Sequence, residues 1–142
     1  MDKKILIIED EPDIREAIAE AIADAGFTVF TAENGAVGFE KAIAEKPDVI
    51  LLDIVMPVLD GHATLKKLRQ DPWGQSVKVI MLTSMDDVHN VGGAHEQKIT
   101  DYLIKPHSSL AEIVKKVREY AISWWLFSWT QTAQLNQSSP VS

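Results

Sequence analysis

The stretch that decides the fold is Val49-Ile50-Leu51-Leu52-Asp53-Ile54-Val55-Met56-Pro57. Its first four residues are apolar, and Lys46-Pro47 just before them is a signal that ends a helix. A short, unbroken apolar run is typical of a strand buried on both faces, at the centre of a parallel sheet. This strand ends at Asp53, which either caps a turn or has a chemical task, because burying an unpaired carboxylate costs several kcal/mol.

On both sides of this stretch, strand-like apolar runs alternate with helix-like segments. Helices are indicated by apolar residues at spacings of three and four, by Pro12 in a first turn and by Gly26 at a helix end. The helix expected over residues 86–98 is the least secure, because an interior glycine costs about 1 kcal/mol relative to alanine and Gly92-Gly93 lie there. Strands are expected at residues 4–8, 27–32, 49–53, 77–82 and 101–104, and the last helix is expected to begin at Ser108 or Ser109.

Five strands alternating with five helices predict an α/β fold, in which a parallel sheet carries helices on both faces. The expected form is the flavodoxin-like, doubly wound sheet with the strand order 2-1-3-4-5. In such sheets ligands bind outside the carboxyl ends of the strands, where the strand order reverses. The residues that follow the strands are therefore the candidates for function.

Polar residues stand at the ends of four of these strands: Glu9 and Asp10, Asp53, Thr83 with Ser84, and Lys105. Strands one and three are neighbours in the expected order, so that three carboxylates come together there. Like charges at short range repel one another, and a divalent cation is the usual remedy. With oxygen ligands only, Mg²⁺ is the first choice, and Mn²⁺ or Ca²⁺ are substitutes.

The lysine and the threonine extend this site toward phosphoryl chemistry. Lys105 supplies a mobile positive charge and Thr83 supplies a hydroxyl. A carboxylate, a hard metal, an ammonium group and a hydroxyl around one void form a phosphoryl-binding site. The nucleophile is expected to be Asp53, whose carboxylate forms an aspartyl phosphate in such a site.

Four motifs follow one another in order and at domain-like spacing: Ile7-Ile8-Glu9-Asp10-Glu11-Pro12, Leu51-Leu52-Asp53-Ile54-Val55-Met56-Pro57 with Asp60-Gly61, Met81-Leu82-Thr83-Ser84, and Tyr102-Leu103-Ile104-Lys105-Pro106. Together they resemble the receiver domain of bacterial two-component response regulators, in its single-domain, CheY-like form. The resemblance covers roughly residues 3–119.

The resemblance implies a role for each strand-end residue. Asp53 would accept a phosphoryl group from a phosphohistidine, and Asp10, Asp53 and the backbone carbonyl of Val55 would bind Mg²⁺ directly, with Glu9 acting through a water. Thr83 would donate a hydrogen bond to the phosphoryl group, and Lys105 would pair with it. Tyr102 would be the aromatic switch that turns inward as Thr83 moves. The bond between Lys105 and Pro106 is cis in such domains.

The function expected from these residues is a phosphorylation-dependent signalling switch rather than an enzyme. Its phosphodonor would be a sensor histidine kinase or a phosphotransfer protein. Phosphorylation would change the partner-binding surface formed by the fourth helix, the fifth strand and the fifth helix, to which a downstream protein or a second copy of the chain would bind. We expect a stand-alone receiver domain over residues 1–119.

Two alternatives to this function remain open. One is an interaction module that keeps the fold but does not respond to phosphate; the intact acid, threonine and lysine positions argue against it. The other is a Mg²⁺-dependent phosphatase with an aspartate nucleophile, a class that normally carries a second Asp two residues further on, where Val55 stands. Because Val55 and Met85 are apolar and cannot position an attacking water, we expect slow hydrolysis of the phosphorylated form.

Composition and charge fit this function. The 142 residues contain no cysteine, so disulfides and thiolate metal sites are excluded. Residues 1–71 carry 15 acidic against 8 basic residues, whereas residues 72–142 carry 6 against 6. An acidic half does not suit direct binding of nucleic acid.

The sequence contains neither a signal-peptide pattern nor a membrane-spanning run. The apolar run at the N-terminus is too short for a signal peptide, and no apolar run reaches about 18 residues, the length needed to span a bilayer. A cytoplasmic protein is expected.

Residues 120–142 form a charge-free, tryptophan-rich extension. The phase of the last helix continues through Trp124 and Trp125, which predicts an extended helix to about residue 130, and the polar residues 131–142 are expected to be disordered. An apolar face here would suit a dimer contact, a docking site or packing against the domain. Alternatively, the extension is non-native and has no function. A membrane anchor is disfavoured because basic residues are missing from it.

Overall fold

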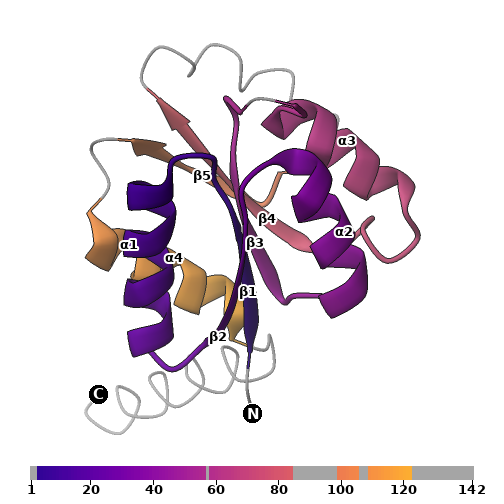
Figure 1. Ribbon diagram of the computed structural model, residues 1–142. Coiled ribbons are helices and arrows are strands. Elements are labelled where there is room, and N and C mark those ends of the chain that lie inside the picture. Colours follow the sequence, from indigo (N-terminus) through magenta and orange to yellow (C-terminus); the bar gives the residue numbers. More distant parts are fainter. Residues whose placement is uncertain (1–2, 57, 85–98, 106–108, 123–142) are drawn as a thin grey trace, which may run out of the picture.

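The computed structural model describes residues 3–56, 58–84, 99–105 and 109–122, with only the backbone at residues 83, 84, 104 and 105 (Figure 1). The five strands are β1 (Lys4–Ile8), β2 (Thr28–Ala32), β3 (Val49–Asp53), β4 (Lys78–Ser84) and β5 (Asp101–Lys105). The helices of the described residues are α1 (Pro12–Asp24), α2 (Gly35–Glu45), α3 (Gly61–Gln70) and α4 (Leu110–Ala121). The helix expected over residues 86–98 lies outside the described residues.

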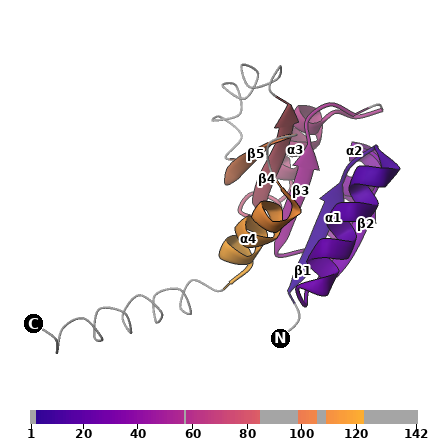
Figure 2. The ribbon, with the colours of Figure 1, turned by 90° about the vertical axis from the view of Figure 1, so that its left-hand side faces the viewer.

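The strands form one parallel sheet in the order β2-β1-β3-β4-β5, which confirms the predicted topology. The helices cover both faces: α1 and α4 lie on one side of the sheet, and α2 and α3 lie on the other (Figures 1 and 2). Alternate residues of the central strands supply the two cores. Ile50 and Leu52 pack on the side of α2 and α3, whereas Val49 and Leu51 pack on the side of α1 and α4.

Side-chain caps define where the helices begin. The side chains of Asn34, Asp60 and Ser109 accept hydrogen bonds from the backbone N–H groups three residues further on, at 2.8–3.2 Å. Such caps satisfy backbone donors that the first helical turn leaves without a partner. α1 instead begins with proline and ends before Gly26, whose φ of 101° is a left-handed conformation that favours glycine. The proline start and the glycine stop of α1 are as predicted.

In the described part of the chain, α4 ends at Ala121, and Ile122 has an extended backbone with φ −67° and ψ 134°. The rest of the extension, residues 123–142, lies outside the described residues, and with it the predicted helix to about residue 130 and the predicted disorder of residues 131–142. Within the described part of the chain, no helix is long and apolar enough to cross a membrane.

A polar contact joins the start of β5 to α4. The Asp101 carboxylate accepts hydrogen bonds from Lys116 Nζ and from the Tyr120 hydroxyl, both at 2.8 Å. Burial, followed by the hydrogen bond to Asp101 and the charge of that carboxylate, raises the pKa of Tyr120 to about 12. The folded protein therefore holds the phenolic proton more tightly than the unfolded chain does.

This contact predicts a pH dependence of stability in alkaline solution. A raised pKa contributes stability that is complete below the unfolded value of about 10 and is lost as the pH rises through the folded value. We expect the free energy of unfolding to fall between about pH 10 and pH 12. Tyr120→Phe should remove this part of the pH dependence, as measured by urea unfolding across the range. Equal slopes in both proteins would contradict the prediction.

Candidate functional site

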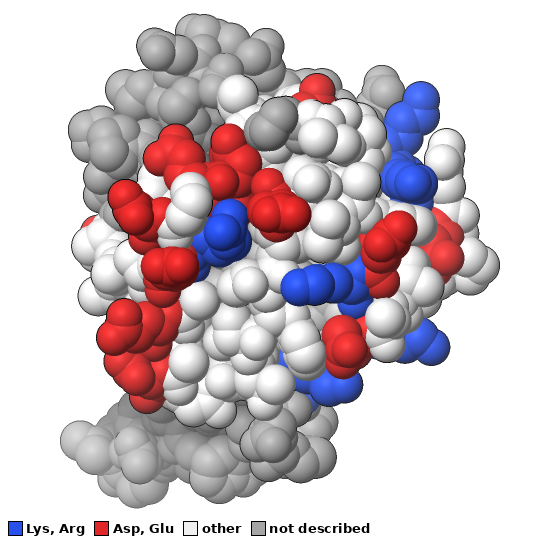
Figure 3. Space-filling view, in the orientation of Figure 1, with Lys and Arg blue, Asp and Glu red and all other residues white. Residues whose placement is uncertain are grey.

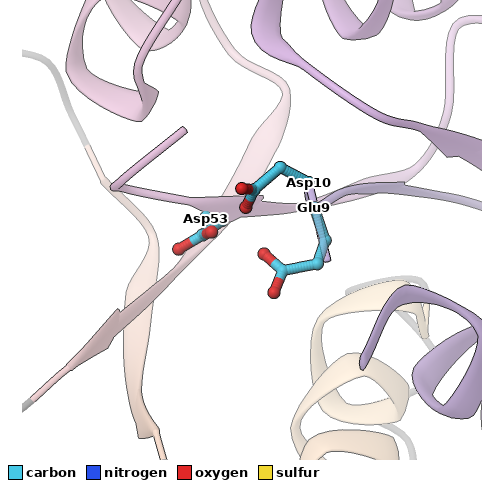
Figure 4. Close-up of side chains that lie close together, drawn as sticks. All are labelled: Glu9, Asp10 and Asp53. Carbon is cyan, nitrogen blue, oxygen red and sulfur yellow. The ribbon is translucent and has the colours of Figure 1, made fainter. Parts of the chain in front are cut away.

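The carboxyl ends of β1 and β3 bring the predicted acidic residues together. In the parallel pairing of these strands, Ile8 is opposite Leu52, so that the residues after them, Glu9 and Asp53, continue side by side. The backbone N–H of Glu9 still donates to the carbonyl oxygen of Ala32 on β2, at 3.0 Å, which extends the sheet pairing by one residue. Figure 4 shows the carboxyl groups of Glu9, Asp10 and Asp53 gathered at this edge.

The three carboxyl groups are close enough to share one ion. One carboxylate oxygen from each of Glu9, Asp10 and Asp53 lies within 4.8 Å of the other two. Glu9 is fully buried and Asp53 is 6% exposed, whereas Asp10 is partly open to solvent. An ion could therefore reach the cluster on the side of Asp10. This is the arrangement predicted from the strand ends.

A hard divalent cation fits this donor set. All three donors are carboxylates, and the chain contains no cysteine that would favour a softer metal. Mg²⁺ is commonly held by one or two carboxylates with several waters, which suits a cluster that is partly open to solvent. A cation also offsets the repulsion among the negative groups, since they lie within 4.8 Å of one another.

Arg15 holds the backbone of the acidic turn and was not identified from the sequence. Its guanidinium group donates hydrogen bonds to the carbonyl oxygens of Glu9 and Asp10, at 2.9 and 3.4 Å. This side chain of α1 therefore fixes the loop that carries two of the three carboxylates. In the sequence, Arg15 is the one basic residue of an otherwise acidic helix. A solvent-exposed arginine explains this pattern as well as an arginine that binds the turn, so the sequence alone did not identify its role.

Gly61 allows α3 to approach the end of β3 closely. A Cβ atom at this position would lie 2.4 Å from the carbonyl oxygen of Asp53 and 2.7 Å from Cα of Ile54. The Gly61 N–H donates to the carbonyl oxygen of Ile54 at 2.8 Å. The absence of a side chain at Gly61 thus sets the course of the backbone that positions Asp53.

β4 and β5 place the backbones of Thr83 and Lys105 at the same edge of the sheet. Asp53 pairs with Leu82, so Thr83 follows directly beyond the end of β3, and Lys105 pairs with Ser84. The N–H of Ile54 donates to the carbonyl oxygen of Leu82 at 3.1 Å, which fixes this register. The predicted roles of the Thr83 and Lys105 side chains, and the predicted cis bond before Pro106, lie outside the described part of the structure.

The loop after β3 exposes apolar side chains beside the acidic cluster. Val55 is 61% and Val58 is 80% exposed. Val58 also has a φ of 71°, a left-handed conformation that is unusual for a β-branched residue. Tyr102 on β5 is 44% exposed, so the predicted switch residue is open to solvent in this structure.

Acidic side chains extend from the site over the neighbouring surface. Figure 3 shows Asp and Glu residues gathered over the side of the molecule on which α1 lies. The exposed acidic residues of α1 and the residue before it are Glu11, Asp13, Glu16, Glu20 and Asp24. Negative potential of this kind attracts divalent cations and repels nucleic-acid phosphates.

Comparison with known proteins identifies relatives of this chain. Residues 5–118 match the family described as the response regulator receiver domain. The chain is 37% identical over 108 residues to the alkaline phosphatase synthesis transcriptional regulatory protein PhoP of Bacillus subtilis, covering 76% of this chain and 44% of PhoP. It is 36% identical over 115 residues to the transcriptional activator protein IrlR of Burkholderia pseudomallei, covering 81% of this chain and 48% of IrlR.

The solved structures that resemble the fold include the chemotaxis protein CheY4 of Vibrio cholerae. The TM-score is 0.79 at 27% sequence identity, and the match covers 84% of this chain and 99% of CheY4. The chain spans about half the length of the curated relatives PhoP and IrlR.

Proposed function

Because the chain belongs to the response regulator receiver domain family, we propose that it is a phosphorylation-dependent signalling switch whose phosphoacceptor is Asp53. The observation that supports this most directly is the cluster of Glu9, Asp10 and Asp53, with oxygens within 4.8 Å of one another at the carboxyl edge of the sheet. Among the three, only Asp53 lies at the end of the central strand, with Thr83 on the neighbouring strand. Response regulators of two-component systems use this site for an aspartyl phosphate and for Mg²⁺.

The proposed reaction transfers a phosphoryl group to Asp53 from the phosphohistidine of a sensor kinase or a phosphotransfer protein. A carboxylate oxygen of Asp53 forms a bond to phosphorus while the phosphorus–nitrogen bond of the donor breaks, and the electron pair stays on the imidazole. Asp10, Asp53 and the carbonyl oxygen of Val55 would hold Mg²⁺, with Glu9 acting through a water. The ion supplies positive charge for the phosphoryl oxygens.

We expect Asp10→Asn to weaken Mg²⁺ binding at least about tenfold, because even an outer-shell partner of a metal site contributes that much. The substitution keeps the size of the side chain and removes one negative oxygen donor from the cluster. The affinity is measured by titrating MgCl₂ and following the backbone amide signals of Glu9, Asp10 and Asp53 by NMR. Asp13→Asn is the matched control: it removes an equal charge from the exposed surface of α1, and it should leave the affinity nearly unchanged. Equal losses in the two variants would contradict a defined site.

Thr83, Lys105 and Tyr102 are proposed to convert phosphorylation into a change of surface. The new phosphoryl group adds negative charge and acceptor oxygens beside β4 and β5, which Thr83 and Lys105 would contact. Tyr102, now 44% exposed, would turn inward and change the surface of β5. A downstream protein or a second copy of the chain would bind there. This output is a population shift between two arrangements of one surface.

Val55 is proposed to make the phosphorylated form long-lived. Its side chain is 61% exposed beside the acidic cluster and cannot form a hydrogen bond to an attacking water. We expect Val55→Asn to shorten the lifetime of the phosphorylated protein several-fold, because an amide can position that water. The lifetime is measured by following loss of the phosphoryl group after the donor is removed. Val58→Asn, a substitution of the same type three residues away, is the control. A lifetime that Val55→Asn leaves unchanged would contradict this role.

The proposed function is tested by locating the phosphoryl group chemically. The full chain is incubated with Mg²⁺ and acetyl phosphate, and borohydride then reduces an acyl phosphate so that the modified aspartate becomes homoserine. Peptide mass spectrometry is expected to find homoserine at residue 53 only. An unmodified chain would instead favour an interaction module that does not respond to phosphate. Modification at another acidic residue would show that the acceptor was wrongly assigned.

A further inference from the structure

A pocket lies at the opposite edge of the sheet from the acidic cluster. It is formed where β1, β3 and β4 begin and where α4 ends, near the N-terminus at the bottom of Figure 1. Its volume is about 420 Å³, which is within the range of small-molecule pockets. The strands between the two sites are five to seven residues long, so about 15 Å of sheet separates them.

Basic side chains line this pocket, although the protein as a whole is acidic. Lys3, Lys46 and Lys78 contribute three ammonium groups, and Asp48 contributes the one carboxylate among the described residues of the lining. The Asp48 carboxylate accepts a hydrogen bond from the backbone N–H of Lys4 at 2.8 Å, which holds it against β1. The described lining therefore has a net positive charge, on a chain whose formal net charge is −7. A concave surface concentrates such a potential.

A hydrogen bond holds one of these lysines in place. Lys78 is partly buried, and its ammonium group donates to the carbonyl oxygen of Tyr120 at 2.6 Å, at the end of α4. An ammonium group has three donor protons, so this bond leaves donors for a ligand. Lys46 is the C-terminal cap residue of α2, with a left-handed φ of 49°, and its exposed side chain lines the pocket. Ser76 adds a hydroxyl to the lining.

We propose that this pocket binds a small phosphorylated molecule through its phosphate oxygens, independently of the acidic cluster. Phosphate presents several negative oxygens to the ammonium groups of Lys46 and Lys78 and to the Ser76 hydroxyl, whereas a cation would be repelled. The ligand would touch the end of α4 through Lys78 and Tyr120.

The experiment titrates the full-length protein with inorganic pyrophosphate in the presence of EDTA and follows backbone amide signals by NMR. Without divalent cations, the acidic cluster repels this probe. We expect saturable shifts at Lys46, Asp48, Val77 and Ile122. Lys46→Gln and Lys78→Gln should each raise the dissociation constant about tenfold, the loss expected for one charge-assisted hydrogen bond. Asp48→Asn should lower it, because a negative group is removed from the lining.

Two controls separate this site from general charge effects and from the phosphorylation site. Lys66→Gln removes an equal charge from the exposed face of α3, outside the pocket, and should leave the dissociation constant unchanged. Asp53→Asn should bind pyrophosphate as the wild type does, even though it removes the proposed phosphoacceptor. The proposal is overturned by shifts that do not saturate, by shifts at the acidic cluster instead, or by equal effects of Lys66→Gln and Lys78→Gln. The absence of any shift would also overturn it.

Discussion

Replacing Asp53 by asparagine is expected to lower the rate at which the chain is phosphorylated by a factor of at least about a thousand. The amide of asparagine is a poor nucleophile and carries no charge for a metal. Because the amide has nearly the same shape as the carboxylate, it should fit the position at the end of β3, where Asp53 is 6% exposed, and leave the fold intact.

The measurement compares phosphate incorporation from acetyl phosphate, with Mg²⁺ present, by intact-protein mass spectrometry. Asp24→Asn is the matched control, since it makes the same chemical change at an exposed position at the end of α1. Urea unfolding of both variants shows whether each is folded. A folded Asp53→Asn protein that is phosphorylated as fast as the wild type would refute the assignment of the acceptor.

The second large effect is expected at Gly61. In Gly61→Ala the new methyl carbon would be placed 2.4 Å from the carbonyl oxygen of Asp53 and 2.7 Å from Cα of Ile54, and both neighbours are backbone atoms that cannot rotate away. The start of α3 must then move away from β3. We expect a loss of about 2–3 kcal/mol in the free energy of unfolding, the upper part of the range for overpacking. Alanine's higher helix propensity offsets little of this, because Gly61 is the first residue of its helix.

The function should suffer as well, because the displaced backbone carries Asp53. We expect Gly61→Ala to lower both Mg²⁺ affinity and the rate of phosphorylation. Gly26→Ala is the control: Gly26 has a φ of 101°, but a Cβ atom there would meet nothing within 4 Å, so the cost is conformational only. That variant should lose about 1 kcal/mol and keep normal phosphorylation. Equal behaviour of the two variants would contradict the steric explanation.

Much of the site was predictable because the chemistry stands at the strand ends. The apolar run 49–52 indicated the central strand, and the carboxylates after it and after β1 followed from the order of a doubly wound sheet. The helix start at Ser109 was also readable, since its cap uses a side chain and a backbone group only three residues apart. Interactions of short range in the sequence leave a local signature.

Other contacts depend on how the elements pack together and left no such signature. The hydrogen bonds from Arg15 to the turn at Glu9 depend on how α1 packs on the sheet. The pocket lined by Lys46 and Lys78 depends on four elements that meet only after folding.

The sequence by itself thus determined the order of the elements and the kinds of group at the strand ends, because hydrophobic periodicity records which face of each segment is buried. Only the tertiary structure decided that oxygens of Glu9, Asp10 and Asp53 approach within 4.8 Å, and that α3 comes close enough to Asp53 to require Gly61. These distances are set by the pairing of strands and the packing of helices from separate parts of the chain, rather than by any local preference.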